Sequence, residues 1–306
     1  MSSSHLTLSP YLEEIYDAVK AACPGEGRRK WRLRVAEEFW TLPKEEKERV
    51  LSRSVSVDEE TAAFEADDDP LDDVADEDAP GLGLVIRTDF SDENAWEYFV
   101  TKLKEGEAEF TADSNENAED DAMDQDPLAS SNSQNASSGV PAAVEDEDSE
   151  SEETPSNASI FAIINPDTSS PLRSVLTGCS NLSALKLFNS VNVRRTPPLP
   201  PDTKRHRPAN RLIDHDGWQE IYEGKMLWIY DAKSNKDACV RVVSQAGAGY
   251  GTATADSWRA RVTHICELQV NLASGAMSID FGGLDRYDYE ERLRNLQEAE
   301  GGVRQQ

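Results

Sequence analysis

The sequence predicts an α/β fold, a mixed sheet with helices, together with a separate N-terminal helical unit and disordered acidic tracts. Short apolar runs of strand length alternate with segments of helical periodicity in the second half of the chain. Apolar residues at helical spacing occupy residues 9–53, and two long tracts contain many acids but no Lys or Arg. These three observations predict an ordered domain, a helical unit before it, and segments too polar to fold alone.

The acidic residues are concentrated in two tracts. The formal net charge is −28, and residues 55–80 and 111–159 hold 12 and 14 acids, which is 26 of the 59 in the chain. The other segments carry 33 acids and 31 bases, so they are nearly neutral. We therefore predict a helical unit at 1–54, a disordered acidic linker at 55–80, an α/β domain at 81–300 with a disordered acidic insert at 111–158, and a tail at 301–306.

The N-terminal unit is expected to contain three helices. Leu12 to Val19 and Trp31 to Leu42 each keep one apolar face, and Pro43 suits the first turn of a third helix. The basic residues around Trp31 suit the solvated face of a helix or a nucleic-acid patch. We expect no nucleic-acid partner, because five charges on one short helix are common.

The domain is expected to begin with a strand and a helix. Asp89 or Ser91 can cap that helix, which then presents Trp96 and Phe99 on one apolar face. A charged helix is expected from Tyr289 to Glu300. The remaining predicted elements are a short helix at 182–188 and strands at 82–87, 160–164, 226–230 and 239–243.

Composition and motifs exclude several function classes. No run approaches 18 apolar residues and the N-terminus has no secretory pattern, so we expect no membrane span and a cytoplasmic or nuclear location. The four cysteines lie far apart, as expected of free thiols. A dinucleotide fingerprint has its third glycine three residues after the second. The glycines at positions 247, 249 and 251 do not have this spacing, so no cofactor is expected. No spacing of ligands predicts a metal site.

Two acidic turns are the candidate ligand cleft. Asp89 and Asp92 follow the first expected strand, and Asp214, His215 and Asp216 form a second group further along the chain. Carboxylates beside a histidine suit acid–base chemistry if the two turns meet at the strand ends, where α/β folds bind ligands. The alternative is that the second group is a polar turn before a helix.

The clearest short motif is the proline-rich segment 194–201. Arg194, Pro197 and Pro200 stand three residues apart, which places them along one ridge of a polyproline helix. Src-homology-3 domains read this pattern, because their aromatic grooves hold prolines and an acid holds the Arg. The alternative is a rigid connection packed on the domain. The basic residues at 194–195 and 204–207 also resemble a bipartite nuclear signal.

Two windows resemble a domain family of unknown function found in bacterial and fungal proteins. Residues 84–99 (LVIRTDFSDENAWEYF) are close to that family's strand, TDFSD turn and tryptophan, and residues 267–284 are similar to its C-terminal stretch. The resemblance covers 81–110 and 159–285. It implies a small α/β domain and no activity.

The sequence therefore favours a non-enzymatic binding or regulatory protein that uses Arg194, Pro197 and Pro200 to contact a Src-homology-3-type partner. The alternative is an enzyme whose site is lined by the acids of the two turns, and the sequence leaves enzymatic activity open.

Overall fold

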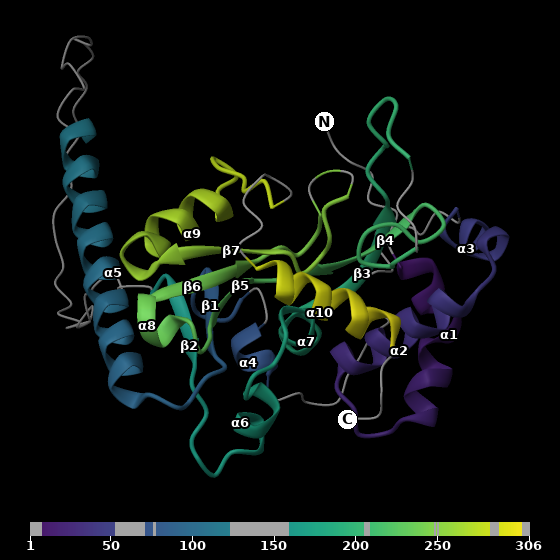
Figure 1. Cartoon of the computed structure of the whole chain (residues 1–306), viewed down its shortest axis with the longest axis horizontal. Helices are drawn as coiled ribbons and strands as arrows, with labels where there is room; N and C mark the ends of the chain where they lie inside the picture. The colour runs from purple at the N-terminus through teal and green to yellow at the C-terminus, as the bar shows by residue number, and fades with distance from the viewer. Residues whose placement is uncertain are drawn as a thin grey trace, which may run out of the picture.

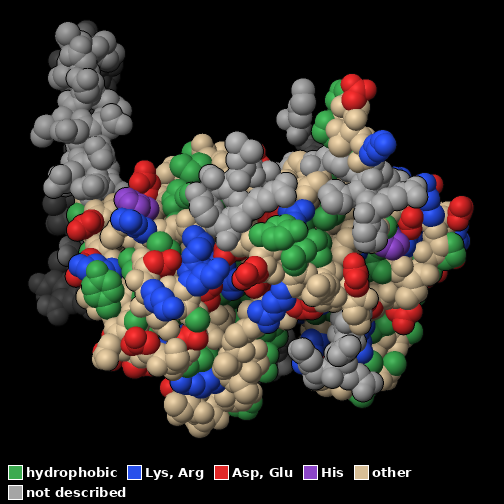
Figure 2. Space-filling model, in the orientation of Figure 1, with side chains coloured by type: hydrophobic (Ala, Val, Ile, Leu, Met, Phe, Trp, Pro, Cys, Tyr) green, Lys and Arg blue, Asp and Glu red, His purple; other side chains and the backbone are tan. Residues whose placement is uncertain are grey.

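The structure of the protein is a computed structural model (Figure 1). The structure describes residues 8–52, 71–75, 78–122, 159–204, 209–247, 249, 251–281 and 288–301. On the face drawn in Figure 2, acidic and basic side chains are intermixed, as expected once the acidic tracts are set aside.

A five-stranded mixed sheet lies at the centre of the domain, which confirms the α/β fold class. Its order is β2-β1-β5-β6-β7, with β2, β1 and β5 parallel and β6 and β7 antiparallel. Four of these strands are the apolar runs that the sequence predicted. The bounds are β1 Gly83–Arg87, β2 Phe161–Ile164, β5 Met226–Tyr230, β6 Cys239–Val243 and β7 Ser257–Arg261.

Both faces of the sheet are buried, which explains why its strands are continuous apolar runs. Alternate residues of β1 and β5 join two different hydrophobic clusters. Leu84 and Ile229 belong to one cluster, and Val85 and Trp228 belong to the other. The helix α9 (Ile265–Ala273) is tied to the second face, because Trp228 Nε1 donates a 2.7 Å hydrogen bond to Gln269 Oε1.

Helices cover the two faces of the sheet (Figure 1). The helices α5 and α9 pack on the Trp228 face, and α7 packs on the face that carries Leu84. The predicted helices at 182–188 and 289–300 correspond to α7 and α10. The bounds are α4 Asp72–Ala75, α5 Glu93–Ala122, α6 Pro171–Leu176, α7 Asn181–Phe188, α8 Ser234–Asp237, the 3-10 turn η1 Val262–His264 and α10 Tyr289–Glu300.

The helix α5 is longer than the sequence predicted. It begins at Glu93, is capped by Asp92 rather than by Asp89 or Ser91, and continues to Ala122. Residues 111–122, expected to belong to a disordered insert, are therefore helical. The rest of the insert and most of the acidic linker lie outside the described residues.

A two-stranded antiparallel ribbon, which the sequence did not predict, lies beside the main sheet. It pairs β3 (Ser190–Arg195) with β4 (Trp218–Glu223), with Ser190 opposite Glu223 and Arg195 opposite Trp218. Polar residues of both strands face inward, and Asn192, Gln219 and Glu220 are all buried. The apolar alternation that normally identifies a strand is confined to Val191 and Val193 in β3 and is absent from β4.

The N-terminal helices α1 (Ser9–Ala22), α2 (Arg28–Thr41) and α3 (Lys44–Leu51) pack on this ribbon. The sequence predicted a separate unit, but Trp31 and Phe39 lie in the same hydrophobic cluster as Trp218. The backbone N–H of Leu8 donates a buried 2.8 Å hydrogen bond to Asn192 Oδ1. The helices and the ribbon therefore share one core.

Within the described part of the chain, no helix has both the length and the apolar character that a membrane crossing requires.

Candidate functional site

The residues Asp214 to Gly217 form a tight hairpin at the start of β4. His215 and Trp218 exchange two backbone hydrogen bonds, of 2.8 and 3.1 Å, across the two-residue loop Asp216–Gly217. Asp216 and Gly217 have φ values of 60° and 93°, as a type I′ turn requires. The expectation that this turn precedes a helix is therefore wrong, since the Asp-Gly pair leads into a strand.

A buried lysine that the sequence did not identify lies beneath this hairpin. Lys47 Nζ lies 3.5 Å from His215 Nδ1 and 3.6 Å from Asp216 Oδ2, and its side chain is 1% exposed. It also faces the rings of Phe39 and Trp40, with Nζ at 5.9 and 5.3 Å from their centres. The sequence does contain a signal for the burial of Lys47. This residue precedes Val50 and Leu51 by three and four positions, which places all three on the inner face of α3.

The two bases of this group have depressed pKa values. Burial lowers the pKa of Lys47, although the neighbouring Asp216 opposes the shift. Burial and then the charge of Lys47 lower the pKa of His215, against the opposing effect of Asp216 and Asp214. His215 is therefore neutral at pH 7, and Asp216 is the counter-ion of Lys47.

A cavity of about 310 Å³ opens beside His215, where α2, the loop before β4 and the end of α10 meet. Arg211 lies on its wall and bridges two carboxylates, at 2.5 Å from Glu37 and 3.2 Å from Glu220. Trp40 Nε1 donates a 2.8 Å hydrogen bond to the same Glu220. The lining residues are Glu37, Trp40, Thr41, Ala209, Asn210, Arg211, His215, Ala299 and Glu300.

The first residue of the proline motif is half-buried and hydrogen bonded within the protein. Arg194 belongs to β3, and its guanidinium donates to Gln219 Oε1 at 3.1 and 2.9 Å and to the carbonyl of Gly247. Burial lowers the pKa of Arg194. The prediction that Arg194 is exposed and free for a partner is therefore wrong. Pro197 is half-buried, whereas Pro200 is exposed as expected.

The segment after β3 projects from the body of the protein (Figure 1). Pro198, Leu199 and Pro201 are exposed, Leu199 by 41%. A turn ends the segment, with Thr203 N donating to the carbonyl of Pro200 at 3.2 Å and Asp202 at φ 65°. This is the geometry of a type II turn with proline at its second position. Residues 205–208 of the basic cluster lie outside the described residues.

The other predicted turn, Asp89 to Asp92, lies at a different place. Asp89 Oδ1 accepts hydrogen bonds from Ser91 and, at 2.8 Å, from Asn235 of α8. Burial alone would raise the pKa of Asp89, but these hydrogen bonds outweigh it and the pKa is lowered. The partners of this turn are on α5 and α8, far from α3 in Figure 1, so the two predicted acidic turns form no common cleft.

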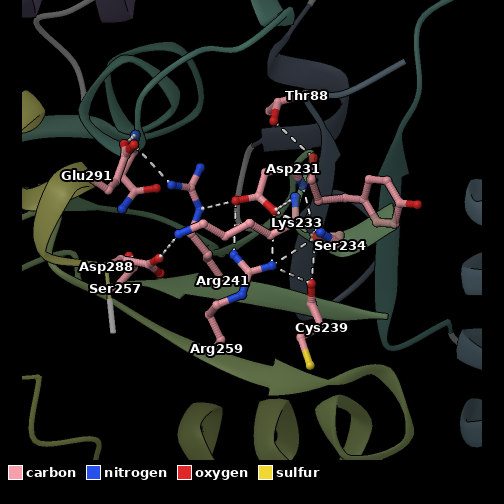
Figure 3. Close-up of polar contacts among 12 residues, drawn as sticks. Thr88, Asp231, Lys233, Ser234, Cys239, Arg241, Ser257, Arg259, Asp288 and Glu291 are labelled. Atoms are coloured by element: carbon pink, nitrogen blue, oxygen red, sulfur yellow. Dashed lines mark hydrogen bonds and ion pairs between the residues drawn. The ribbon is translucent and has the colours of Figure 1, made fainter. Parts of the chain in front are cut away.

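A group of charged side chains lies where β5 ends (Figure 3). Arg259 and Arg241 reach from the neighbouring strands toward Asp231, with both terminal nitrogens of Arg259 at 3.0 Å from its two oxygens. Arg241 also pairs with Glu291 of α10 at 3.1 Å. Burial raises the pKa of Asp231, but the arginines outweigh this and lower it. Each ionic side chain drawn here has an opposite charge within 4 Å, so the group ties β5, β6, β7 and α10 together.

The structure offers little support for nucleophilic or metal chemistry among the described residues. Burial raises the pKa of Cys179 and of Cys266 to about 12, so both thiols stay protonated near neutral pH. Within the described ranges, no group of three or more His, Cys, Asp or Glu side chains is arranged to hold a metal ion.

Comparison of the chain with protein-family models, with curated proteins and with solved structures found no match. The resemblance of residues 84–99 and 267–284 to a domain family of unknown function stays a prediction.

Proposed function

We propose that this is a non-enzymatic binding protein that presents its proline-rich segment to a partner with an aromatic groove of the Src-homology-3 type. The observation that carries the proposal is the exposure of an apolar ridge on a short segment held at its base. A proline-rich segment loses little conformational entropy on binding, because its backbone is already restricted.

The base of the segment is fixed to the ribbon. Arg194 is hydrogen bonded to Gln219, and Thr196 donates its N–H to the carbonyl of Gly217 at 3.0 Å and its hydroxyl to Asp214 at 3.3 Å. A segment tied down at this point presents its prolines in one orientation, which favours recognition over a merely flexible tether.

The exposed residues favour a register one residue later than the one the sequence first suggested. Arg195, Pro198 and Pro201 repeat the basic-x-x-Pro-x-x-Pro pattern, and all three are exposed. The side chain of Arg195 is 53% exposed and stacks on the ring of Trp218 at 3.8 Å. Its only ion pair among the described residues is a long one, at 3.8 Å from Glu48, so an acid of the partner can compete for it.

Titration of the full chain with a panel of purified Src-homology-3 domains tests this proposal. The double variant Pro198→Ala, Pro201→Ala is expected to weaken binding about tenfold, because two groove anchors are lost. The matched control, Pro197→Ala with Pro200→Ala, should change the affinity less than about threefold. Absence of binding to every domain of the panel would reject the partner class, and a larger loss in the control pair would reject the shifted register.

A further inference from the structure

The cavity beside Trp40 lies where the N-terminal helices meet the rest of the domain. Its volume of about 310 Å³ is at the lower end of the range for small-molecule sites, and such sites favour junctions between structural units. None of residues 194–201 lines the cavity, so the cavity is independent of the function proposed above.

Two helix ends with negative partial charge meet at this cavity. Trp40 and Thr41 belong to the last turn of α2, and Ala299 and Glu300 belong to the last turn of α10. The carbonyl groups at the C-terminal end of a helix carry about half a negative elementary charge, which basic residues commonly offset. Neither helix has a basic residue in its last turn, so both ends favour a cation brought from outside.

The charged side chains around the cavity are also unbalanced. Arg211 is shared by Glu37 and Glu220, so one guanidinium faces two carboxylates. Glu300 is exposed, and none of the described residues forms an ion pair with it. Lys47 is balanced by Asp216, and the lowered pKa of His215 keeps that ring neutral at pH 7. Among the described residues around the cavity, the acids therefore outnumber the bases.

One wall of the cavity is an aromatic surface, the ring of Trp40. Trp40 is half-buried, and the hydrogen bond to Glu220 fixes its ring. Trp rings attract cations through their π face, as Lys47 already illustrates at 5.3 Å.

We propose that this cavity binds an organic cation that carries a primary ammonium or guanidinium group. The acids and the two helix ends attract the charge, and Trp40 packs against the aliphatic part of the ligand. The cation can be a free small molecule or the basic side chain of a peptide, which brings carbonyl acceptors as well.

Binding is measured by titrating the full chain with agmatine, a free guanidinium amine, and with N-acetyl-arginine amide, which imitates a peptide side chain. The indole N–H signal of Trp40, one of six tryptophans, is assigned by its loss in Trp40→Phe and reports on the cavity. We expect saturable binding with a Kd of about 1 mM or tighter, weakened by added salt. Tighter binding of agmatine identifies a small molecule as the source of the cation, and tighter binding of the arginine amide identifies a peptide.

Two variants separate the cavity from general charge effects. Glu300→Gln should weaken binding about fivefold, since it removes a carboxylate from the wall. Ala209→Phe, at an exposed lining position, should abolish binding by filling the cavity. Glu290→Gln is the matched control, because it removes an exposed acid at the opposite end of α10. The proposal fails if neither cation binds below about 10 mM, if 1-pentanol binds equally well, or if Glu290→Gln has the effect of Glu300→Gln.

Discussion

The Nζ of Lys47 lies 3.5 Å from Nδ1 of His215, although 168 residues separate them in the chain. This contact joins α3 to the hairpin before β4, and it places two bases against one acid, Asp216. Because His215 takes part in this contact, protonation of its ring should weaken the attachment of the N-terminal helices.

We expect the protein to lose stability as the pH falls through the mid-range. The pKa of His215 is lowered in the folded protein, so between that pKa and the ordinary value near 6.5 the unfolded chain binds more protons. The free energy of unfolding then rises with pH in this window and falls on acidification. Urea unfolding at several pH values checks this in the wild type and in His215→Gln. The prediction fails if both proteins lose stability in parallel.

Removing the acid and removing the base of the Lys47 pair should have different effects. Asp216→Asn keeps a residue that tolerates φ 60° but leaves Lys47 without its counter-ion, and we expect a loss of about 2 kcal/mol. Lys47→Met places an apolar chain of similar length against Phe39 and Trp40 and should be nearly neutral. Chemical denaturation compares the two. A larger loss for Lys47→Met would mean that the amine itself is required.

The ionic group at the end of β5 should be a major source of stability. Asp231→Asn leaves Arg241 and Arg259 without the carboxylate they share, and a loss of about 3 kcal/mol is expected. Glu105→Gln is the control, because the pair of Glu105 with Lys102 lies on the surface and should contribute little to stability. Equal effects of the two variants in thermal unfolding would contradict the assignment.

The N-terminal helices should remain attached after the chain is cut. The test inserts a specific protease site between Asp68 and Asp69 and cuts the chain there. We expect both fragments to elute together in size-exclusion chromatography, because Trp31, Phe39 and Leu8 are buried in the shared core. Arg211→Met with Trp40→Phe removes two of the polar links and should promote separation. Immediate separation of the wild-type fragments would show that the helices fold as their own unit.

Much of the sheet could be predicted from sequence because its strands are buried on both faces. Apolar runs of this kind are not expected on a protein surface, and each of them forms a strand. They contain Leu84, Ile163, Trp228 and Val242. The ribbon escaped prediction for the opposite reason. Its buried positions include Asn192, whose burial is tolerated because its oxygen accepts from Leu8 and its amide nitrogen donates to Glu223.

The site residues were harder to predict, because their roles depend on partners distant in the chain. Asp214, His215 and Asp216 were identified by composition, but nothing local reveals that Lys47 lies beneath them. Arg194 and Arg195 are adjacent and chemically identical in sequence. Successive side chains of a strand point to opposite faces, so Arg194 points toward Gln219 and Arg195 toward solvent. The difference between the two arginines could be seen only once β3 was known.

The position of the N-terminal helices over the ribbon has a practical consequence for truncated chains. A fragment that begins at residue 81 would expose Val191, Val193 and Trp218 to water on a two-stranded ribbon. Bare apolar strands recruit other copies of themselves, so such a fragment is expected to aggregate rather than to behave as a minimal domain. Shortened versions of this protein should therefore keep α1, α2 and α3.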